Sequence, residues 1–309
     1  METLDREFEA VTIEDIPLIS SYLKKAKYEE SNHNIIGFIL WQETYPLWKY
    51  EGENWLILLG IHNQELFVYM PLCEKRYFKE AILAAKKVFD YYHVPFVLSC
   101  FVKEEMDFVT EVFPNYSGIE YRDNADYVYL TEKLRSFSGK KLQRKRNHLN
   151  AFYKMYEQHF VYESMNGENA LECISFLRDW KGEDKDEFLD EERRGTERLL
   201  TLWDLLPAKG GIIRIDGKIK AFIVGSVLSE RMCQINIEKA DNNYRGLYQA
   251  ILKEFLDREF LEYTYINRED DMGKENIRQA KMAYYPEFLI MKYRLCEEVG
   301  NDPKIDTGR

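Results

Sequence analysis

Residues 211–239 read GIIRIDGKIKAFIVGSVLSERMCQINIEK, and the expected fold follows from them. Asp216-Gly217 is the strongest turn signal in the chain, because an Asp-Gly pair readily adopts the positive φ angles of a two-residue hairpin turn. The flanking residues 211–216 and 218–228 are rich in β-branched side chains, and residues 231–239 continue this composition. We therefore expect a hairpin followed by a third strand.

Helices and further strands are expected on both sides of these three strands. In order, the second half is predicted to contain helices at 170–181 and 191–206, the three strands, a helix at 248–260, a strand at 263–266, a helix at 274–283 and a strand at 288–293. The helix at 248–260 has the clearest apolar face, formed by Ile251, Leu252, Phe255 and Leu256.

The first half repeats this order of elements. Its predicted elements are a strand at 8–13, helices at 14–27 and 35–43, strands at 47–50, 55–61 and 65–70, a helix at 74–92, a strand at 96–101, a helix at 104–113 and a strand at 127–130. The two halves share little residue identity, so the order of elements is the evidence for an internal repeat.

This order looks like the GNAT acyltransferase fold twice over. We expect an α+β protein of two tandem GNAT-like acyltransferase domains, residues 1–130 and 131–309, each with a mixed, mostly antiparallel sheet flanked by helices. The resemblance implies that the sheet splays between two central strands and that an acyl donor enters the gap. We expect the second domain to be the active one and the first to be non-catalytic, because the turn at 71–76 in the first half has no glycine.

A cationic segment opens the second half. Residues 138–148 read SGKKLQRKRNH, and five of the seven residues from 140 to 146 are Lys or Arg, although the chain has a formal net charge of -11. We expect a helix here with Ser138 as its N-cap. The segment predicts either an anion site or a solvated basic face, and its cations are Lys140, Lys141, Arg144, Lys145, Arg146 and His148. We expect Lys145 and Arg146 to face a cleft between the halves; full exposure of both would contradict this.

The strand at 231–239 leads through Arg245-Gly246 into a helix. Such a turn can hold a phosphate on backbone N–H groups, but it is equally compatible with an ordinary turn and a solvent-facing arginine. Glu238 is predicted to share a strand face with Gln234 and Asn236. Its carboxylate could accept a proton from an amine nucleophile, or it could form a salt bridge to Lys239 or Arg245.

Residues 267–286 follow the next strand. Arg278 and Lys281 are predicted on one face of a helix whose cap is Asp270 or Asp271. Tyr284, near the end of that helix, could donate a proton to a leaving group, although a core position is also compatible. The acids at 269–271 do not have the spacing of a calcium loop, so no metal site is expected.

The amino-acid composition limits the classes of protein to which the chain can belong. Of 309 residues, 45% are hydrophobic and 15% aromatic, so large cores are expected. Five scattered cysteines without a CxxC spacing favour reduced thiols and argue against a disulfide framework or a structural zinc site. The polar start is not typical of a signal peptide, and no apolar run has the roughly 20 residues needed to span a bilayer. We expect a cytoplasmic protein without stable membrane insertion, and the acidic balance argues against a broad nucleic-acid footprint.

Several motifs together resemble the phosphatidylglycerol lysyltransferase C-terminal domain family, which is related to the Fem-type aminoacyltransferases. The residues that carry this resemblance are Ser138-Gly139-Lys140-Lys141, Lys145-Arg146-Asn147-His148, Asn150, Glu238-Lys239-Ala240, Asn267-Arg268-Glu269, Gly273, Arg278, Lys281, Tyr284 and Pro286. One departure is Ala283, where a small hydroxyl residue is expected.

The resemblance implies acyl transfer, in the best-known members from aminoacyl-tRNA to a lipid head group. It adds Asn267 to Glu238 and Tyr284 as predicted catalytic residues. It also adds Arg268 to the predicted phosphate-binding residues, with Arg245, Gly246, Arg278, Lys281 and the cations of residues 140–148.

We therefore expect an acyltransferase in which an amine or hydroxyl acceptor attacks the donor ester directly. The donor is aminoacyl-tRNA or an acyl-CoA, no resident cofactor is expected, and tRNA is an expected partner. An acetyl-CoA-dependent N-acetyltransferase and a non-catalytic binder of an anionic or phosphorylated ligand are the alternatives. No GxSxG, HExxH or GxxxxGKS motif points to a hydrolase or nucleotide-binding class. An open cleft lined by Glu238 and Tyr284 would favour an enzyme, and a filled cleft would favour the binder.

Overall fold

The computed structural model of the protein describes residues 8–62, 64–180 and 187–298. Its helices are α1 (Ile16–Ala26), α2 (Ile35–Trp41), α3 (Phe78–Tyr91), α4 (Lys103–Val112), α5 (Thr131–Ser136), α6 (Gln143–Tyr156), α7 (Gly167–Asp179), α8 (Glu187–Thr201), α9 (Leu247–Glu259) and α10 (Glu275–Met282). Its strands are β1 (Glu9–Ala10), β2 (Leu47–Glu51), β3 (Trp55–His62), β4 (Glu65–Val68), β5 (Leu72–Cys73), β6 (Leu98–Phe101), β7 (Tyr116–Leu130), β8 (Phe160–Ser164), β9 (Ala208–Ile215), β10 (Lys218–Val227), β11 (Met232–Ala240), β12 (Tyr265–Asn267) and β13 (Phe288–Glu297).

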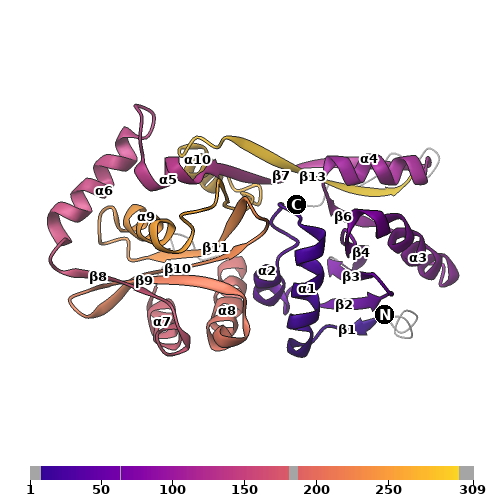
Figure 1. Ribbon diagram of the computed structural model, residues 1–309, viewed down its shortest axis with the longest axis horizontal. Helices are drawn as coiled ribbons and strands as arrows, with labels where there is room; N and C mark the ends of the chain where they lie inside the picture. Colours follow the sequence, from indigo (N-terminus) through magenta and orange to yellow (C-terminus); the bar gives the residue numbers. More distant parts are fainter. Residues whose placement is uncertain (1–7, 63, 181–186, 299–309) are drawn as a thin grey trace.

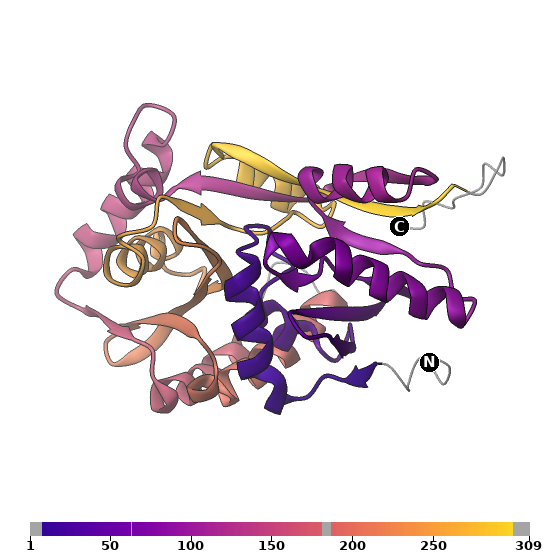
Figure 2. The same ribbon diagram turned by 45° about the vertical axis from the view of Figure 1, so that its right-hand side comes forward.

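One continuous mixed sheet joins the two halves of the chain. The strand order is β1-β2-β3-β4-β6-β13-β7-β12-β11-β10-β9-β8, and β5 pairs with β3. The last strand, β13, therefore lies between two strands of the first half, and β7 pairs in turn with β12 of the second half. In both Figure 1 and Figure 2, β7 and β13 run side by side across the molecule. The α+β class with helices flanking a mixed sheet is confirmed.

The hairpin predicted at residues 211–228 is present as β9 and β10. Asp216 and Gly217 both have positive φ angles, 48° and 78°, as a two-residue hairpin turn requires. The third strand, β11, pairs with β10 but carries an irregularity, because Val224 lies opposite Ile237 while the next residue of β10, Gly225, lies opposite Ile235. Residue 236 is thus an extra residue in β11, which is the arrangement of a β-bulge.

The bulge makes the simple alternation predicted for β11 wrong. Ile235 packs in the core beneath α9, whereas Ile237 packs in the core shared with α2, α7 and α8, so residues two apart lie on opposite faces. Glu238 consequently points to the α6 and α9 side, where it meets Arg268. Gln234 instead bonds to residues of the α1–α2 loop.

Helices cover both faces of the second-half strands. Figure 1 shows α6 and α9 on one side of β8–β11 and α7 and α8 on the other. The core beneath α7 and α8 also contains apolar residues of α1 and α2, so one hydrophobic cluster spans the two halves. Gly195 of α8 lies so close to α2 that a Cβ atom there would overlap the backbone carbonyl oxygen of Leu40.

Among the predicted boundaries that differ from the structure, two bear on the arrangement of the site. The strand predicted at 127–130 begins at Tyr116, because the whole of β7 pairs with β13. The basic helix begins at Gln143 with Leu142 in the N-cap position, so Ser138 does not cap it. The predicted boundary between residues 130 and 131 stays a prediction.

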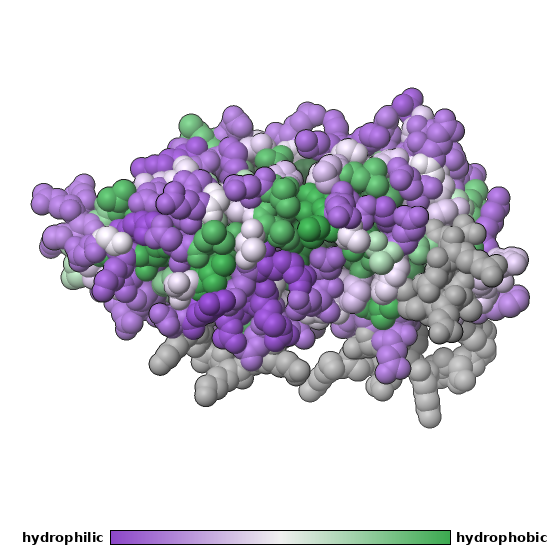
Figure 3. Space-filling model, turned by 90° about the horizontal axis from the view of Figure 1, so that it is seen from below, coloured by the Kyte–Doolittle hydropathy of each residue, from purple (hydrophilic) through white to green (hydrophobic). Residues whose placement is uncertain are grey.

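The face seen from below in Figure 3 is mainly hydrophilic, with hydrophobic residues grouped near its middle. Across residues 8–62, 64–180 and 187–298, no helix has the length and apolar character needed to cross a membrane.

Candidate active site

Close packing of α6 on the turn before α9 brings the predicted basic residues together. Gly246 has a φ of 86°, and a Cβ atom there would overlap the backbone carbonyl oxygen of His148. This contact places His148 near Arg144, Lys145 and Arg245. Partial burial, followed by these three cations, lowers the pKa of His148. The structure therefore joins two motifs that are about 100 residues apart into one basic cluster.

The cations of this cluster lack the ion pairs that most basic side chains in the described part of the chain form. Lys140, Lys141, Arg144 and Arg245 form no ion pair with any residue that the structure describes. Lys140, Lys141 and Arg144 are exposed, and Lys141 Nζ lies 5.1 Å from the centre of the Tyr285 ring. A negatively charged protein thus presents a local surface that favours anions.

The structure separates Lys145 from Arg146, which were predicted to act together. Lys145 is half-buried, and its Nζ lies 4.0 Å from the centre of the Tyr284 ring. Burial and then the neighbouring Arg268 lower the pKa of Lys145. Arg146 turns the other way: its Nη1 donates to the carbonyl oxygens of Phe137 (2.7 Å) and Gly139 (3.2 Å). Only Lys145 reaches the predicted catalytic residues, while Arg146 holds the loop before α6.

Glu238 and Tyr284 meet through Arg268. Arg268 Nη2 lies 2.7 Å from Glu238 Oε2, and its guanidinium lies 4.9 Å from the centre of the Tyr284 ring. Glu238 pairs with this arginine and not with Lys239 or Arg245, the partners considered from the sequence. Burial raises the pKa of Glu238, and the charge of Arg268 opposes that shift. Burial likewise raises the pKa of Tyr284.

The hydroxyl of Tyr284 is oriented by Gln249. Gln249 Nε2 donates to the Tyr284 hydroxyl oxygen at 2.9 Å, and the tyrosine is 7% exposed. Because the oxygen accepts this bond, the hydroxyl hydrogen remains available for donation. This geometry is compatible with the predicted role of Tyr284 as a proton donor.

Side chains fill the gap between β11 and the loop after β12. Arg268 crosses this gap to Glu238, and its side chain is only 15% exposed. One surface cavity is lined by Tyr28, Phe78 and Glu105, and another by Trp180, Arg214 and Lys218. Neither includes Glu238 or Tyr284.

Asn267 is fully engaged inside the protein. Its Nδ2 donates to the carbonyl oxygen of Glu29 at 3.0 Å and to Asp126 Oδ2 at 2.9 Å, and its Oδ1 accepts from Glu269 N at 2.8 Å. These bonds join the loop after β12 to the first half. A catalytic role for Asn267 stays a prediction.

Arg278 and Lys281 also hold this loop. Arg278 donates from Nε and Nη2 to the carboxylate of Asp271 at 2.8 and 2.9 Å, and from Nη2 to Asp123 at 2.7 Å. Lys281 Nζ donates to the carbonyl oxygen of Arg268 at 2.6 Å and to that of Asp270. Burial lowers the pKa of Lys281. Both cations therefore make internal contacts, and neither is placed with the basic cluster of α6.

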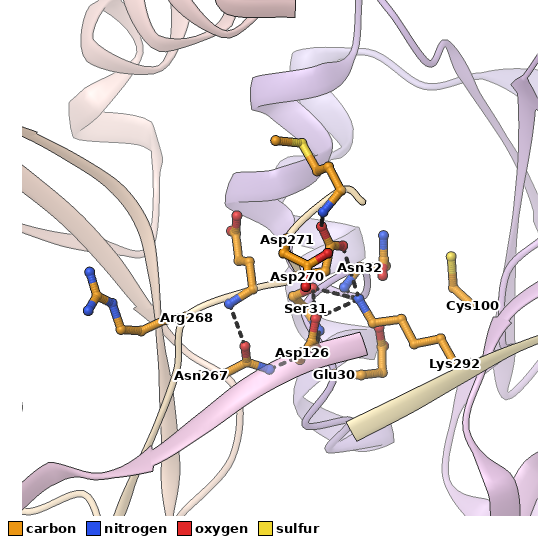
Figure 4. A network of polar contacts seen from close by, with 12 residues as sticks. Glu30, Ser31, Asn32, Cys100, Asp126, Asn267, Arg268, Asp270, Asp271 and Lys292 are labelled. Atoms are coloured by element: carbon orange, nitrogen blue, oxygen red, sulfur yellow. Dashed lines mark hydrogen bonds and ion pairs between the residues drawn. The ribbon is translucent and has the colours of Figure 1, made fainter. Parts of the chain in front are cut away.

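A buried network of polar side chains lies between the halves and was not predicted from the sequence (Figure 4). Lys292 of β13, 2% exposed, lies 2.6 Å from Asp126 Oδ1 of β7 and donates to Ser31 Oγ at 2.9 Å. Glu30 and His33 form a second buried pair in the same α1–α2 loop. A lysine after the apolar residues 288–291 was the available signal, because a buried charge in a strand needs a partner. No group of metal ligands occurs in the described parts of the chain.

The sequence matches the family model described as phosphatidylglycerol lysyltransferase, C-terminal, over residues 24–296. An uncharacterised protein of Mycoplasmoides gallisepticum is 31% identical over 177 residues, which cover 57% of this chain and 57% of that protein. The chain thus matches little more than half the length of this curated relative.

Two solved structures share the fold over nearly the whole chain. A conserved protein of unknown function from Bacteroides thetaiotaomicron has a TM-score of 0.87 and 27% identity, covering 94% of this chain and 99% of that one. L-PGS from Bacillus licheniformis has a TM-score of 0.67 and 16% identity, covering 93% of each chain. At 16% identity the second likeness shows the fold alone.

Proposed function

Because the chain belongs to the phosphatidylglycerol lysyltransferase C-terminal family, as its motifs predicted, we propose that it transfers an amino acid from aminoacyl-tRNA to an amine or hydroxyl acceptor. Family and tandem GNAT-like fold together indicate an acyltransferase. The aminoacyl donor and the class of acceptor are the proposed part.

The observation that carries this proposal is the unpaired basic cluster on α6 and at Arg245. Cations without ion-pair partners, on the surface of a chain with a net charge of -11, suit the phosphates of a polyanionic donor. Lys145 links this cluster to Glu238 and Tyr284. Since α6 lies directly on Gly246, the turn that would hold the pyrophosphate of coenzyme A is partly covered, which favours tRNA as the donor.

The reaction we propose is direct attack on the aminoacyl ester. The acceptor nitrogen or oxygen bonds to the carbonyl carbon, the ester C–O bond breaks, and the ribose hydroxyl of the tRNA leaves. Glu238 accepts the proton of the nucleophile, and Tyr284 donates a proton to the leaving oxygen. Glu238 must be ionised to do so, and because burial raises its pKa, activity should increase with pH through that raised pKa.

Charge reversal on the basic cluster tests donor binding. For Arg144→Glu, we expect weaker binding of aminoacyl-tRNA. The slope of log Kd against log salt should also be shallower, by about one for each phosphate that the variant no longer neutralises. Filter binding over a series of salt concentrations measures both quantities. Lys154→Glu is the matched control, since Lys154 is exposed on the same helix but lies beyond the cluster, in the last turn. Equal effects of the two charge changes would remove the cluster from the donor site.

A non-catalytic binder of an anionic ligand is the second candidate. It is favoured by the filled gap, in which Arg268 and Glu238 neutralise each other. Binding of aminoacyl-tRNA without transfer to any amine, hydroxyl or phosphatidylglycerol acceptor would support it. Transfer from acetyl-CoA in the same acceptor panel would instead identify an N-acetyltransferase.

A further inference from the structure

Asn236 contains a buried hydrogen-bond donor that the fold does not use. The residue is 6% exposed, and its Nδ2 has no hydrogen-bond partner within the described part of the chain. An unsatisfied buried donor costs about 1–3 kcal/mol. A polar group retained at this cost is a candidate for contact with a ligand.

A chain of hydrogen bonds fixes which end of the Asn236 amide is free. Asn34 Oδ1 accepts from Ile36 N at 2.8 Å, so its Nδ2 is the atom that donates to Ser226 Oγ, at 2.7 Å. Ser226 then uses its single hydrogen to donate to Asn236 Oδ1 at 2.8 Å. The acceptor end of Asn236 therefore faces Ser226, and the amide N–H groups are left unpaired. Asn34 belongs to the first half, so that half orients a side chain of the second.

The free amide lies where the sheet opens. The last paired residues of β11 and β12 are Gln234 and Asn267, and Asn236 is the bulged residue two positions further along β11. Glu238 follows two residues later, on the α6 and α9 face of β11, whereas Ser226 and Asn34, which orient Asn236, lie on the α2 face. Because the Oδ1 of Asn236 is bound on the β10 side, its planar amide turns the nitrogen toward the side where β12 has ended.

We propose that Asn236 is a catalytic residue that donates a hydrogen bond to the carbonyl oxygen of the acyl donor. This inference rests on the proposed function. When the acceptor attacks, the carbonyl π electrons move to this oxygen while the new bond to carbon forms. They return when the ester C–O bond breaks. A preorganised amide donor stabilises the charge that develops on the oxygen. Ser226 and Asn34 are positioning residues for it.

The test uses Asn236→Ala and the isosteric Asn236→Asp in the full chain. In aminoacyl transfer assays, we expect kcat to fall about 10²–10³-fold, with KM for aminoacyl-tRNA nearly unchanged. Ser226→Ala should lower kcat less, and Ser226→Thr, which keeps the hydroxyl, should restore it. A phosphonate analogue of aminoacyl-adenosine, which imitates the tetrahedral oxyanion, should bind the Asn236 variants more weakly by a similar factor.

Three outcomes are distinguishable. Loss of kcat and of phosphonate affinity in both Asn236 variants, with unchanged melting temperatures, supports the inference. Wild-type kcat and wild-type phosphonate affinity in Asn236→Asp overturn it and leave the proposed function intact. A wild-type protein that neither transfers from any aminoacyl-tRNA nor binds the phosphonate overturns the proposed function, and the role of Asn236 with it.

Discussion

Glu269 lies in the loop that covers the candidate site. Gln234 Nε2 donates to Glu269 Oε1 at 2.7 Å, and burial raises the pKa of Glu269 to about 7. The nearby Lys281, which holds the same loop, has its pKa lowered by burial. Both shifts disfavour the charged forms, and with a pKa of about 7 Glu269 changes its charge near neutral pH.

Glu269→Gln should alter how stability depends on pH. The folded-state pKa of about 7 lies above the ordinary value of 4.5, so the contribution of Glu269 to stability is complete below pH 4.5 and is lost as pH rises through 7. The wild-type free energy of unfolding should therefore decrease from pH 5 to pH 8, by a Glu269 contribution of about 2–3 kcal/mol. In Glu269→Gln this decrease should be smaller.

Urea unfolding at four pH values measures this difference. Glu157→Gln, a change at an exposed carboxylate, should keep the wild-type pH dependence. Parallel curves for wild type and Glu269→Gln would contradict the assignment.

The contact between the helices α2 and α8 lies in the hydrophobic cluster that spans the two halves. Leu40 lies near the end of α2, and Gly195 lies in the middle of α8, where its missing side chain lets the two backbones approach. Glycine weakens an isolated helix, so its presence here is explained by this approach.

Gly195→Ala should destabilise the protein by about 1–3 kcal/mol, because the added methyl group overlaps the Leu40 carbonyl oxygen and the helices must shift. Gly37→Ala on α2 is the matched control: the nearest atom to its added methyl group is 3.8 Å away. There the gain in helix propensity should stabilise by about 0.5–1 kcal/mol. Thermal unfolding of both variants measures the difference, and a stabilised Gly195→Ala would contradict the packing.

Elements whose signals are local could be predicted from the sequence. The hairpin β9–β10 follows from Asp216-Gly217, and the amphipathic α9 from its apolar spacing. The start of β7 could not be predicted, because residues 116–126 are largely polar and are held as a strand by pairing with β13. The buried network was missed for a similar reason: Ser31 meets Asp126 and Lys292, which are 95 and 261 residues away.

The candidate site could be predicted in part, because some of its residues belong to motifs with local patterns. Lys145, Glu238 and Tyr284 come together, and each belongs to a motif with a local pattern. The internal contacts of Arg146, Arg278 and Lys281 depend on which loops meet in the folded chain, and no local pattern reveals that. The bulge at Asn236 was likewise invisible, because it depends on the register with β10.

The position of β13 joins the two halves of the sheet, and we expect the whole molecule to unfold as a single unit. The last strand lies between β6 and β7 of the first half, and it contributes Lys292 to the buried pair with Asp126. The strands of the first half thus do not form a continuous sheet without residues from near the end of the chain.

A chain ending at residue 286 should therefore lose the cooperative unfolding of both halves, since β6 and β7 lose their shared neighbour and Asp126 loses its cation. Circular dichroism during thermal unfolding and hydrogen exchange of the β3 amides measure this. A chain ending at residue 298, which keeps β13, is the control and should unfold cooperatively. A first half that remains protected after removal of β13 would contradict the single unit.

The most direct test of the proposed function is a single-turnover transfer assay. It measures transfer of labelled amino acids from a panel of aminoacyl-tRNAs to amine, hydroxyl and lipid acceptors, for the wild-type protein and for Glu238→Gln. We predict transfer to at least one acceptor by the wild type and a rate at least about 10²-fold lower for Glu238→Gln, with aminoacyl-tRNA binding unchanged. Binding without transfer by the wild type, or an equal rate for Glu238→Gln, would contradict it.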